Sequence, residues 1–188
     1  LQKKLIRRLQ FAEHFEGARY EVFVAAALIR AGFEIEFEDE DDRNRTHCEF
    51  TGTFKKTGRK FSVEAKCRIG KKVRPEMRLN QALAKRADHD RIIFIETNAP
   101  DPKSDAGVPE ILKWALKTIR RFEGKATKGA NLPVAYLVIS NTPAHHHLQE
   151  EKFRSSLMFE GFRIPEFKSD AAFTSLRQAI DAREKHAE

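Results

Sequence analysis

Strict alternation of apolar and polar residues marks two short segments in the first half of the chain. Residues 33–37 read Phe-Glu-Ile-Glu-Phe, and within residues 61–69 every odd position is apolar and every even position polar. A period of two is typical of a strand with one buried face. We therefore expect strands at both places, with Glu64 and Lys66 on the same polar face of the second strand.

A third alternating segment, residues 47–54, predicts the first arm of a β-hairpin whose second arm contains Glu64. A turn at residues 56–59 would place Glu49 opposite Lys66. A register shifted by two residues would place Glu49 opposite Glu64 instead. Either register brings two carboxylates and one ammonium to a single polar patch.

The rest of the pattern predicts an α/β fold. Continuous apolar runs at residues 91–97 and 134–139 are typical of strands buried on both faces. Apolar residues at helical spacing predict helices at residues 1–15, 17–30, 75–87, 109–122, 149–158 and 170–185, with an extended piece at 162–165. Together they predict a mixed central sheet flanked by helices, in a single domain over residues 1–188.

Positive charge is concentrated in one part of the chain. The net charge is +7, yet residues 55–91 alone hold thirteen Lys or Arg and four Asp or Glu, a net +9. Such a segment favours a polyanionic partner, although an ordinary solvated basic face is the alternative. The candidate nucleic-acid-binding residues are Arg68, Lys71, Lys72, Arg74, Arg78, Gln81 and Lys85.

The polar face of the hairpin offers the chemistry of a metal site. Glu49 and Glu64 lie close enough in either register to share one hard cation, and Mg²⁺ takes one or two carboxylates while keeping several waters. Lys66 would then lie beside a metal-bound water and could orient it or neutralise developing charge. The alternative is a charged outer face without function, as on many hairpins.

One further carboxylate and several soft ligands bear on this interpretation. Glu21 lies on the same stripe of its helix as apolar residues, which directs it toward the interior or a cleft, unless it only complements the helix dipole. Cys48 and Cys67 are expected to be small core residues, with a disulfide or zinc site as the minor alternative. Residues 145–147, three consecutive histidines, are expected in a loop or helix start rather than at a metal.

Composition narrows the setting. Two cysteines do not suggest a secreted disulfide framework, and no apolar run approaches the roughly 18 residues of a membrane span. We therefore expect a cytoplasmic protein that does not cross a membrane, and a homodimer stays open. No Gly-rich phosphate loop is present, which argues against a P-loop nucleotidase.

The order of these features resembles the PD-(D/E)xK nuclease superfamily, with its restriction-endonuclease-like core. Residues 17–21, Gly-Ala-Arg-Tyr-Glu, are similar to the opening helix of Mrr-type enzymes and Holliday-junction resolvases, and residues 64–66 match the Glu-x-Lys triplet. The resemblance covers about residues 15–141 and leaves residues 142–188 as a C-terminal extension.

That resemblance implies roles for individual residues. Glu49, Glu64 and the carbonyl of Ala65 would be metal ligands, Lys66 would activate the water, and Glu21 would assist from its helix. One departure is that the superfamily usually has Asp where this chain has Glu49.

The sequence thus predicts an enzyme that hydrolyses phosphodiester bonds, with DNA favoured over RNA and Mg²⁺ or Mn²⁺ as the cofactor. A nucleic-acid-binding or regulatory module that has lost cleavage is the first alternative, and a protein-interaction domain for an acidic partner is the second.

Overall fold

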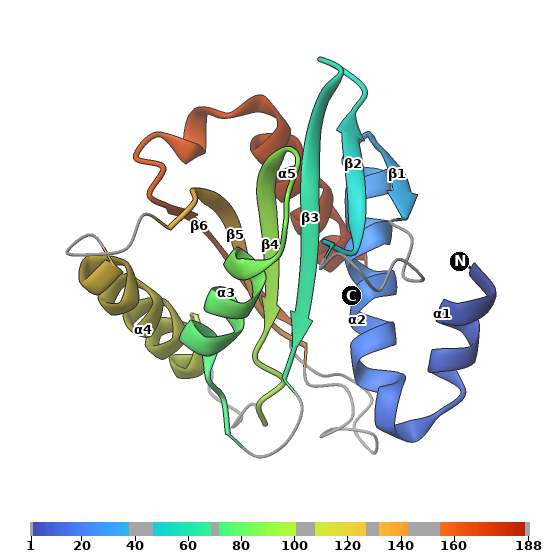
Figure 1. The fold of residues 1–188 in the computed structure, drawn as a ribbon, viewed down its shortest axis with the longest axis horizontal. Coiled ribbons are helices and arrows are strands. Elements are labelled where there is room, and N and C mark those ends of the chain that lie inside the picture. The colour runs from blue at the N-terminus through green and yellow to red at the C-terminus, as the bar shows by residue number, and fades with distance from the viewer. Residues whose placement is uncertain are drawn as a thin grey trace.

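Six strands form one sheet in which spatial neighbours are also neighbours in sequence. The structure is a computed structural model that describes residues 2–37, 47–68, 72–100, 108–126, 132–142 and 155–186. The strands are β1 (Phe33–Phe37), β2 (Phe50–Phe54), β3 (Arg59–Cys67), β4 (Asp90–Glu96), β5 (Ala135–Asn141) and β6 (Ser156–Phe162). Pairing is antiparallel from β1 to β3, parallel from β3 to β5, and antiparallel again at β6, so the sheet is mixed (Figure 1).

Helices cover both faces of this sheet. The long helices are α1 (Gln2–Leu9), α2 (Ala12–Arg30), α3 (Pro75–Ala84), α4 (Glu110–Ala126) and α5 (Ala171–His186), with a short 3-10 turn at Phe167–Ser169. Helices α2 and α5 pack on one face, and α3 and α4 on the other, nearer the viewer in Figure 1. The predicted α/β class with a mixed sheet between helices is therefore confirmed. Among the described helices, none combines the length and apolar character needed to cross a membrane.

The two apolar layers explain why β4 and β5 carry continuous hydrophobic runs. Ile92 and Phe94 of β4 face α2 and α5, whereas Ile93 and Ile95 face α3 and α4. Strands buried on both sides cannot alternate in polarity, as expected for the central parallel part of such a sheet. The edge strand β1 instead keeps Glu34 and Glu36 exposed.

The β2–β3 hairpin has the shifted register. Phe54 pairs with Arg59 and Phe50 with Val63, so residues 55–58 form the turn and the pairing of Glu49 with Lys66 is wrong by two residues. Gly58 has a φ of 72°, a left-handed conformation that glycine adopts without strain, and it closes the turn directly before β3. The N–H of Glu49 donates to the carbonyl of Val63 at 2.9 Å, which extends the pairing toward Glu64.

Three other sequence-based boundaries also change. The first helix ends at Leu9 and α2 already begins at Ala12, because Phe11 is extended where no Gly or Pro signals a break. Helix α3 ends at Ala84 rather than residue 87, so Lys85 follows the helix. The helix expected at residues 149–158 is wrong for its last part, because Ser156–Phe162 adds to the edge of β5 as β6. Tertiary pairing has overridden a weak local preference there.

The two cysteines are buried and not joined by a disulfide. Cys67 lies in the core beneath α2 and α5, as expected. Cys48 does not share the apolar side with Phe50, since its Sγ lies 3.6 Å from the carbonyl of Arg86 on the α3 side. Because β2 begins only at Phe50, the strand alternation does not extend back to Cys48.

The C-terminal region is tied into the same sheet and core. Besides the β5–β6 pairing, Arg59 at the start of β3 forms ion pairs with Asp170 and Asp90, and the Tyr136 hydroxyl donates to Asp170 at 2.8 Å. Asp170 also accepts the backbone N–H groups of Ala172 and Phe173, which caps α5. Burial works against the charged form, but the hydrogen bonds from Tyr136 and Arg59 prevail and lower the pKa of Asp170.

Replacing Gly161 by Ala should destabilise the fold. An added Cβ would lie 2.5 Å from the carbonyl oxygen of Ile164 and 2.7 Å from the Phe167 ring. We expect a loss of about 1–3 kcal/mol in the free energy of unfolding, measured by denaturant titration. The matched control is Gly124→Ala in α4, where an added Cβ would meet nothing within 4 Å and the change should stabilise by about 0.5–1 kcal/mol. Equal effects at both positions would contradict the packing described for β6.

Replacing Asp170 by Asn should cost about 1 kcal/mol or more of unfolding free energy at pH 7. Since the folded-state pKa of Asp170 is lowered, its stabilisation is present above the unfolded pKa of about 3.9 and is lost as pH falls through the folded value. The difference between wild type and variant should therefore shrink below about pH 4, measured by urea titration at several pH values. A difference that grows on acidification would refute this assignment.

Candidate active site

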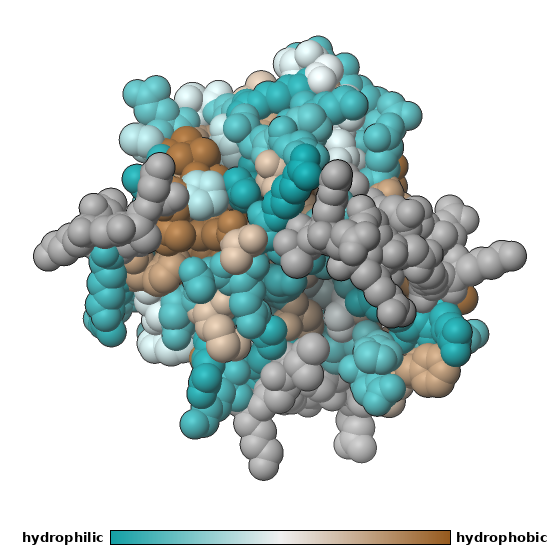
Figure 2. Space-filling view, viewed as in Figure 1, coloured by the Kyte–Doolittle hydropathy of each residue, from teal (hydrophilic) through white to brown (hydrophobic). Residues whose placement is uncertain are grey.

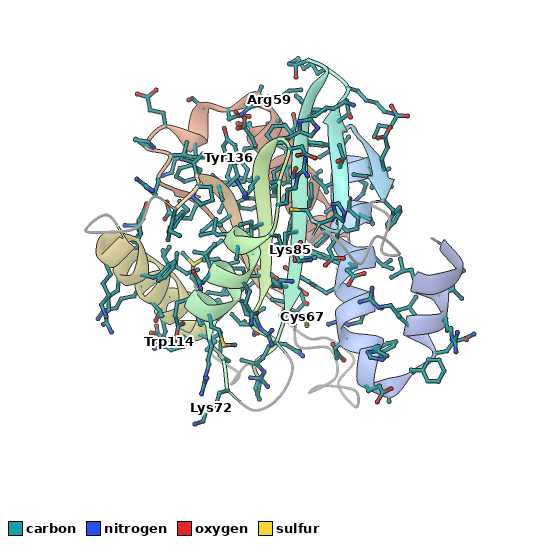
Figure 3. The ribbon with its side chains drawn as sticks, in the orientation of Figure 1. Arg59, Cys67, Lys72, Lys85, Trp114 and Tyr136 are labelled. Carbon is teal, nitrogen blue, oxygen red and sulfur yellow. The ribbon has the colours of Figure 1, made fainter. Side chains whose placement is uncertain are left out.

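The polar face of β3 carries a cluster of four charged side chains from three segments. Glu64 lies in the middle of β3 and Lys66 two residues further along, so both project to the side of α3. Glu49 arrives from the residue before β2, and Lys85 from the residue that follows α3. Figure 3 shows Lys85 between α3 and β3. The hairpin and α3 thus bring together Glu49 and Lys85, which are 36 positions apart in the sequence.

Lys85 bridges the two carboxylates. Its Nζ lies 2.9 Å from Oε1 of Glu64 and 3.1 Å from Oε1 of Glu49. The ammonium of Lys66 forms an ion pair with the same Oε1 of Glu64. One oxygen of Glu64 is therefore shared by two ammonium groups. Lys85 was expected on a nucleic-acid-binding surface, and the structure places it inside the carboxylate cluster instead.

The burial of Glu64 is unfavourable for the stability of the fold. The residue is 1% exposed, and its Oε2 makes no hydrogen bond with any residue that the structure describes. Burial, and then the charge of Glu49, raise the pKa of Glu64, while Lys66 and Lys85 act in the opposite direction. A buried carboxylate oxygen without a partner costs about 1–3 kcal/mol or more, and such groups cluster at functional sites.

The two lysines differ in their surroundings. Burial alone would lower the pKa of Lys85, but Glu64 and Glu49 prevail and raise it well above the usual range. Lys85 is therefore an ammonium at neutral pH. Lys66 has 19% of its side chain exposed and contacts Glu64 from further along the strand, nearer its end at Cys67.

These residues fit a hard divalent cation. Oε2 of Glu64 is an available oxygen donor, and Glu49 supplies a second carboxylate. Strand carbonyls two residues apart point to the same side, so the Ala65 carbonyl points to the β2 side of β3, as the Val63 carbonyl does. Ala65 lies beyond the first β2–β3 pair, Phe50 with Val63. Among the described residues no group of three or more His, Cys, Asp or Glu side chains could hold a metal. Two carboxylates with waters suit Mg²⁺ or Mn²⁺ better than zinc.

Glu21 does not join this cluster. Its two carboxylate oxygens accept hydrogen bonds from the guanidinium of Arg8 at 2.6 and 2.8 Å. Helix α2 also covers the face of the sheet opposite α3. The inward direction expected for Glu21 is observed, since it is 7% exposed, but the interior it faces is the contact with α1. The described contact of Glu21 is thus with α1, and its expected role beside the metal stays a prediction.

The remaining basic candidates gather at the start of α3. Arg68, Arg74 and Arg78 line a small pocket there, and Lys72 is exposed at the lower edge of the view in Figure 3. The part of this edge that carries colour in the space-filling view of Figure 2 is mostly hydrophilic. Gln81 accepts a hydrogen bond from Arg78 at 3.3 Å. Lys71, the acidic residues 38–42 and the histidines 145–147 lie outside the described residues.

A polar pocket that the sequence did not reveal adjoins the cluster. It has a volume of about 160 Å³. Its lining residues are Glu36, His47, Cys48, Thr51, Lys60, Ser62, Arg86, Asp88 and His89. Ser62 lies on the Glu64 side of β3, which the alternation gave, but Arg86 and His89 follow α3 and only tertiary structure brings them here. Burial, and then Glu64, raise the pKa of Cys48 to about 12, so its thiol is protonated and no nucleophile.

A second buried glutamate was also missed, and it is structural. Glu96, 1% exposed at the end of β4, accepts hydrogen bonds from the backbone N–H groups of Asn98 and Thr142 and from the hydroxyls of Ser140 and Thr142. All of its hydrogen-bonding capacity joins the ends of β4 and β5. In contrast to Glu64, it has no free oxygen for a ligand.

Comparison with known proteins gives no relative to guide this interpretation: no family model, no curated protein and no solved structure matches the chain.

Proposed function

We propose that this protein is a metal-dependent nuclease that hydrolyses phosphodiester bonds, with DNA as the expected substrate. The observation that carries the proposal is the buried Glu64, whose Oε2 has no described hydrogen-bond partner. This carboxylate lies next to Glu49 and Lys66. The resemblance to the PD-(D/E)xK superfamily agrees with this chemistry. Such an enzyme is expected in the cytoplasm.

Three residues of the cluster have chemical roles in this proposal. Glu49 and Glu64 would hold Mg²⁺ or Mn²⁺, with the Ala65 carbonyl as a further donor. When bound, the metal supplies a Lewis acid for the phosphate and lowers the pKa of a coordinated water. Lys66 lies on the same face of β3 as Glu64, where its ammonium can orient that water and neutralise charge developing on the phosphate.

The basic residues at the start of α3 would hold the substrate backbone. Arg68, Arg74 and Arg78 line one pocket, and Lys72 extends the positive surface into solvent. Arginine binds phosphate oxygens through paired N–H donors, which positions a strand without reading its sequence. Gln81 could add a polar contact from the same helix.

A binding module without cleavage is the second candidate. The observation in its favour is that an ammonium, Lys85, lies between the two carboxylates. The presence of Glu49, where the PD-(D/E)xK superfamily usually has Asp, also favours a binding module. No specific observation favours a protein-interaction domain. Such a domain would be recognised if neither DNA nor RNA competed with its binding to an acidic partner protein.

Replacing Glu64 or Lys66 by Ala should abolish cleavage. We expect the wild type to cut supercoiled plasmid, linear duplex or single-stranded DNA with Mg²⁺ or Mn²⁺, and both variants to lose about 10²-fold or more in rate, because they remove a metal ligand or the group beside the attacking water.

The matched controls are Glu110→Ala and Lys113→Ala, an exposed ion pair on α4 that should leave the rate unchanged. If the wild type binds DNA and cuts nothing, the binding-module candidate is preferred. If cleavage survives both Ala substitutions, the cluster is not the active site.

Replacing Arg74 and Arg78 together by Ala should weaken DNA binding. Each lost phosphate contact reduces the slope of log affinity against log salt by about 0.7–0.9. We expect a slope shallower by about 1.5 and no change of sequence preference, measured by fluorescence anisotropy from 50 to 200 mM salt. The control pair Arg120→Ala and Arg177→Ala removes the same charge from α4 and α5. An unchanged slope in the first variant would place the nucleic-acid surface elsewhere.

A further inference from the structure

We propose that Lys85 is an internal cation at the metal position, so that metal ions bind only by displacing it, and that a substrate phosphate promotes the exchange by accepting the displaced ammonium. This inference rests on the proposed function, because it concerns the metal ligands of that site. It assigns to Lys85 a positioning role that the Glu-x-Lys triplet does not contain.

The location of Lys85 is that of a bridging ion. Its Nζ lies at nearly equal distances, 2.9 and 3.1 Å, from one oxygen of Glu64 and one of Glu49. A metal ion bridging the two carboxylates would occupy the same position as this ammonium. An ammonium has three donors and no lone pair, so it cannot itself ligate a metal.

A metal and Lys85 cannot share these oxygens. Mg²⁺ requires near-ideal octahedral geometry at about 2.1 Å from its oxygen ligands, so an ion held by Oε1 of both carboxylates would overlap the Lys85 ammonium, and one held by Oε2 of Glu64 together with Glu49 would still lie beside it. The two like charges would also repel strongly in a site where Glu64 is 1% exposed. Lys66 pairs with the same Oε1 of Glu64, but its ion pair is with Glu64 and not with Glu49, so Lys85 is the ammonium that lies between the two carboxylates.

The chain around Lys85 allows its side chain to move while its backbone stays fixed. The N–H of Lys85 donates to Ala82 at 3.3 Å, and its carbonyl accepts from the Arg91 guanidinium at 3.2 Å. The side chain is 22% exposed, so four methylenes can carry the ammonium from the carboxylates to solvent. A phosphodiester at the site would provide the anion that Lys85 loses on leaving Glu49 and Glu64.

The exchange couples the two ligands. Metal binding frees Lys85 for phosphate, and phosphate removes the competitor of the metal, so each ligand should raise the affinity for the other by the same factor. Without substrate, the protein should hold metal weakly. Neutralising Lys85 should remove both the competition and the coupling.

The test measures Mn²⁺ affinity by electron paramagnetic resonance of free Mn²⁺, with and without a non-cleavable phosphorothioate DNA. We expect Lys85→Gln to bind Mn²⁺ on the order of tenfold more tightly than wild type in the absence of DNA, because a charged hydrogen-bonding competitor is gone. DNA should tighten Mn²⁺ binding to the wild type and leave Lys85→Gln nearly unchanged. Glu64→Gln identifies the site, and Lys113→Gln, an exposed lysine on α4, controls for net charge.

The outcomes separate this inference from the proposed function. If wild type binds Mn²⁺ through Glu64 and Lys85→Gln binds it equally or more weakly, Lys85 does not compete and only this inference is overturned. If no variant binds Mn²⁺ through Glu64, the metal site and the proposed function fail with it.

A second variant guards against misfolding of Lys85→Gln, which circular dichroism would detect. Lys85→Arg keeps the positive charge between the carboxylates and should bind Mn²⁺ no more tightly than wild type. Tighter binding by Lys85→Arg would also overturn the inference.

Discussion

The burial of one carboxylate, that of Glu64, is the constraint on which the charged cluster depends. A carboxylate that is 1% exposed can remain in a sheet only with cations beside it. Lys66 supplies one from the same strand, and Lys85, which directly follows α3, supplies the other. The end of α3 and the β2–β3 register each bring a charged side chain to this group, Lys85 and Glu49, and Glu49 completes the balance of charge.

The layers on either side of the sheet fix this geometry. The aromatic side chains of β1 to β3, among them Phe33, Phe50 and Phe61, pack against α2 and α5, so the opposite face of the hairpin can be polar. On that opposite face, α3 and α4 bury the central strands through an apolar cluster that includes Leu79 and Ile93. The charged cluster lies at the border of this apolar layer, so that the carboxylate of Glu64 is buried while the Lys85 side chain remains partly exposed to solvent.

Much of this arrangement could be predicted from the sequence, because alternation and apolar runs report burial directly. The strand 33–37, the polar face of Glu64 and Lys66, and the central strands followed from that periodicity. The register did not, since the choice between two turn positions depends on where Gly58 closes the hairpin. Nor did the partners of Glu21 and Lys85, because a charged residue within a helix or directly after one has the same local pattern whether it meets solvent, Arg8 or two carboxylates.

Helix α3 also sets a length. Its ten residues begin at the small pocket lined by Arg68, Arg74 and Arg78 and end next to Lys85, so about 15 Å of helical backbone separates these arginines from Lys85. Along one strand of duplex DNA that distance corresponds to about four base pairs. If a nucleic acid were held at both ends of α3, the length of the helix would fix the distance between the held phosphates. Inserting one helical turn would then move these phosphates relative to Glu64 without altering the arginines or Lys85.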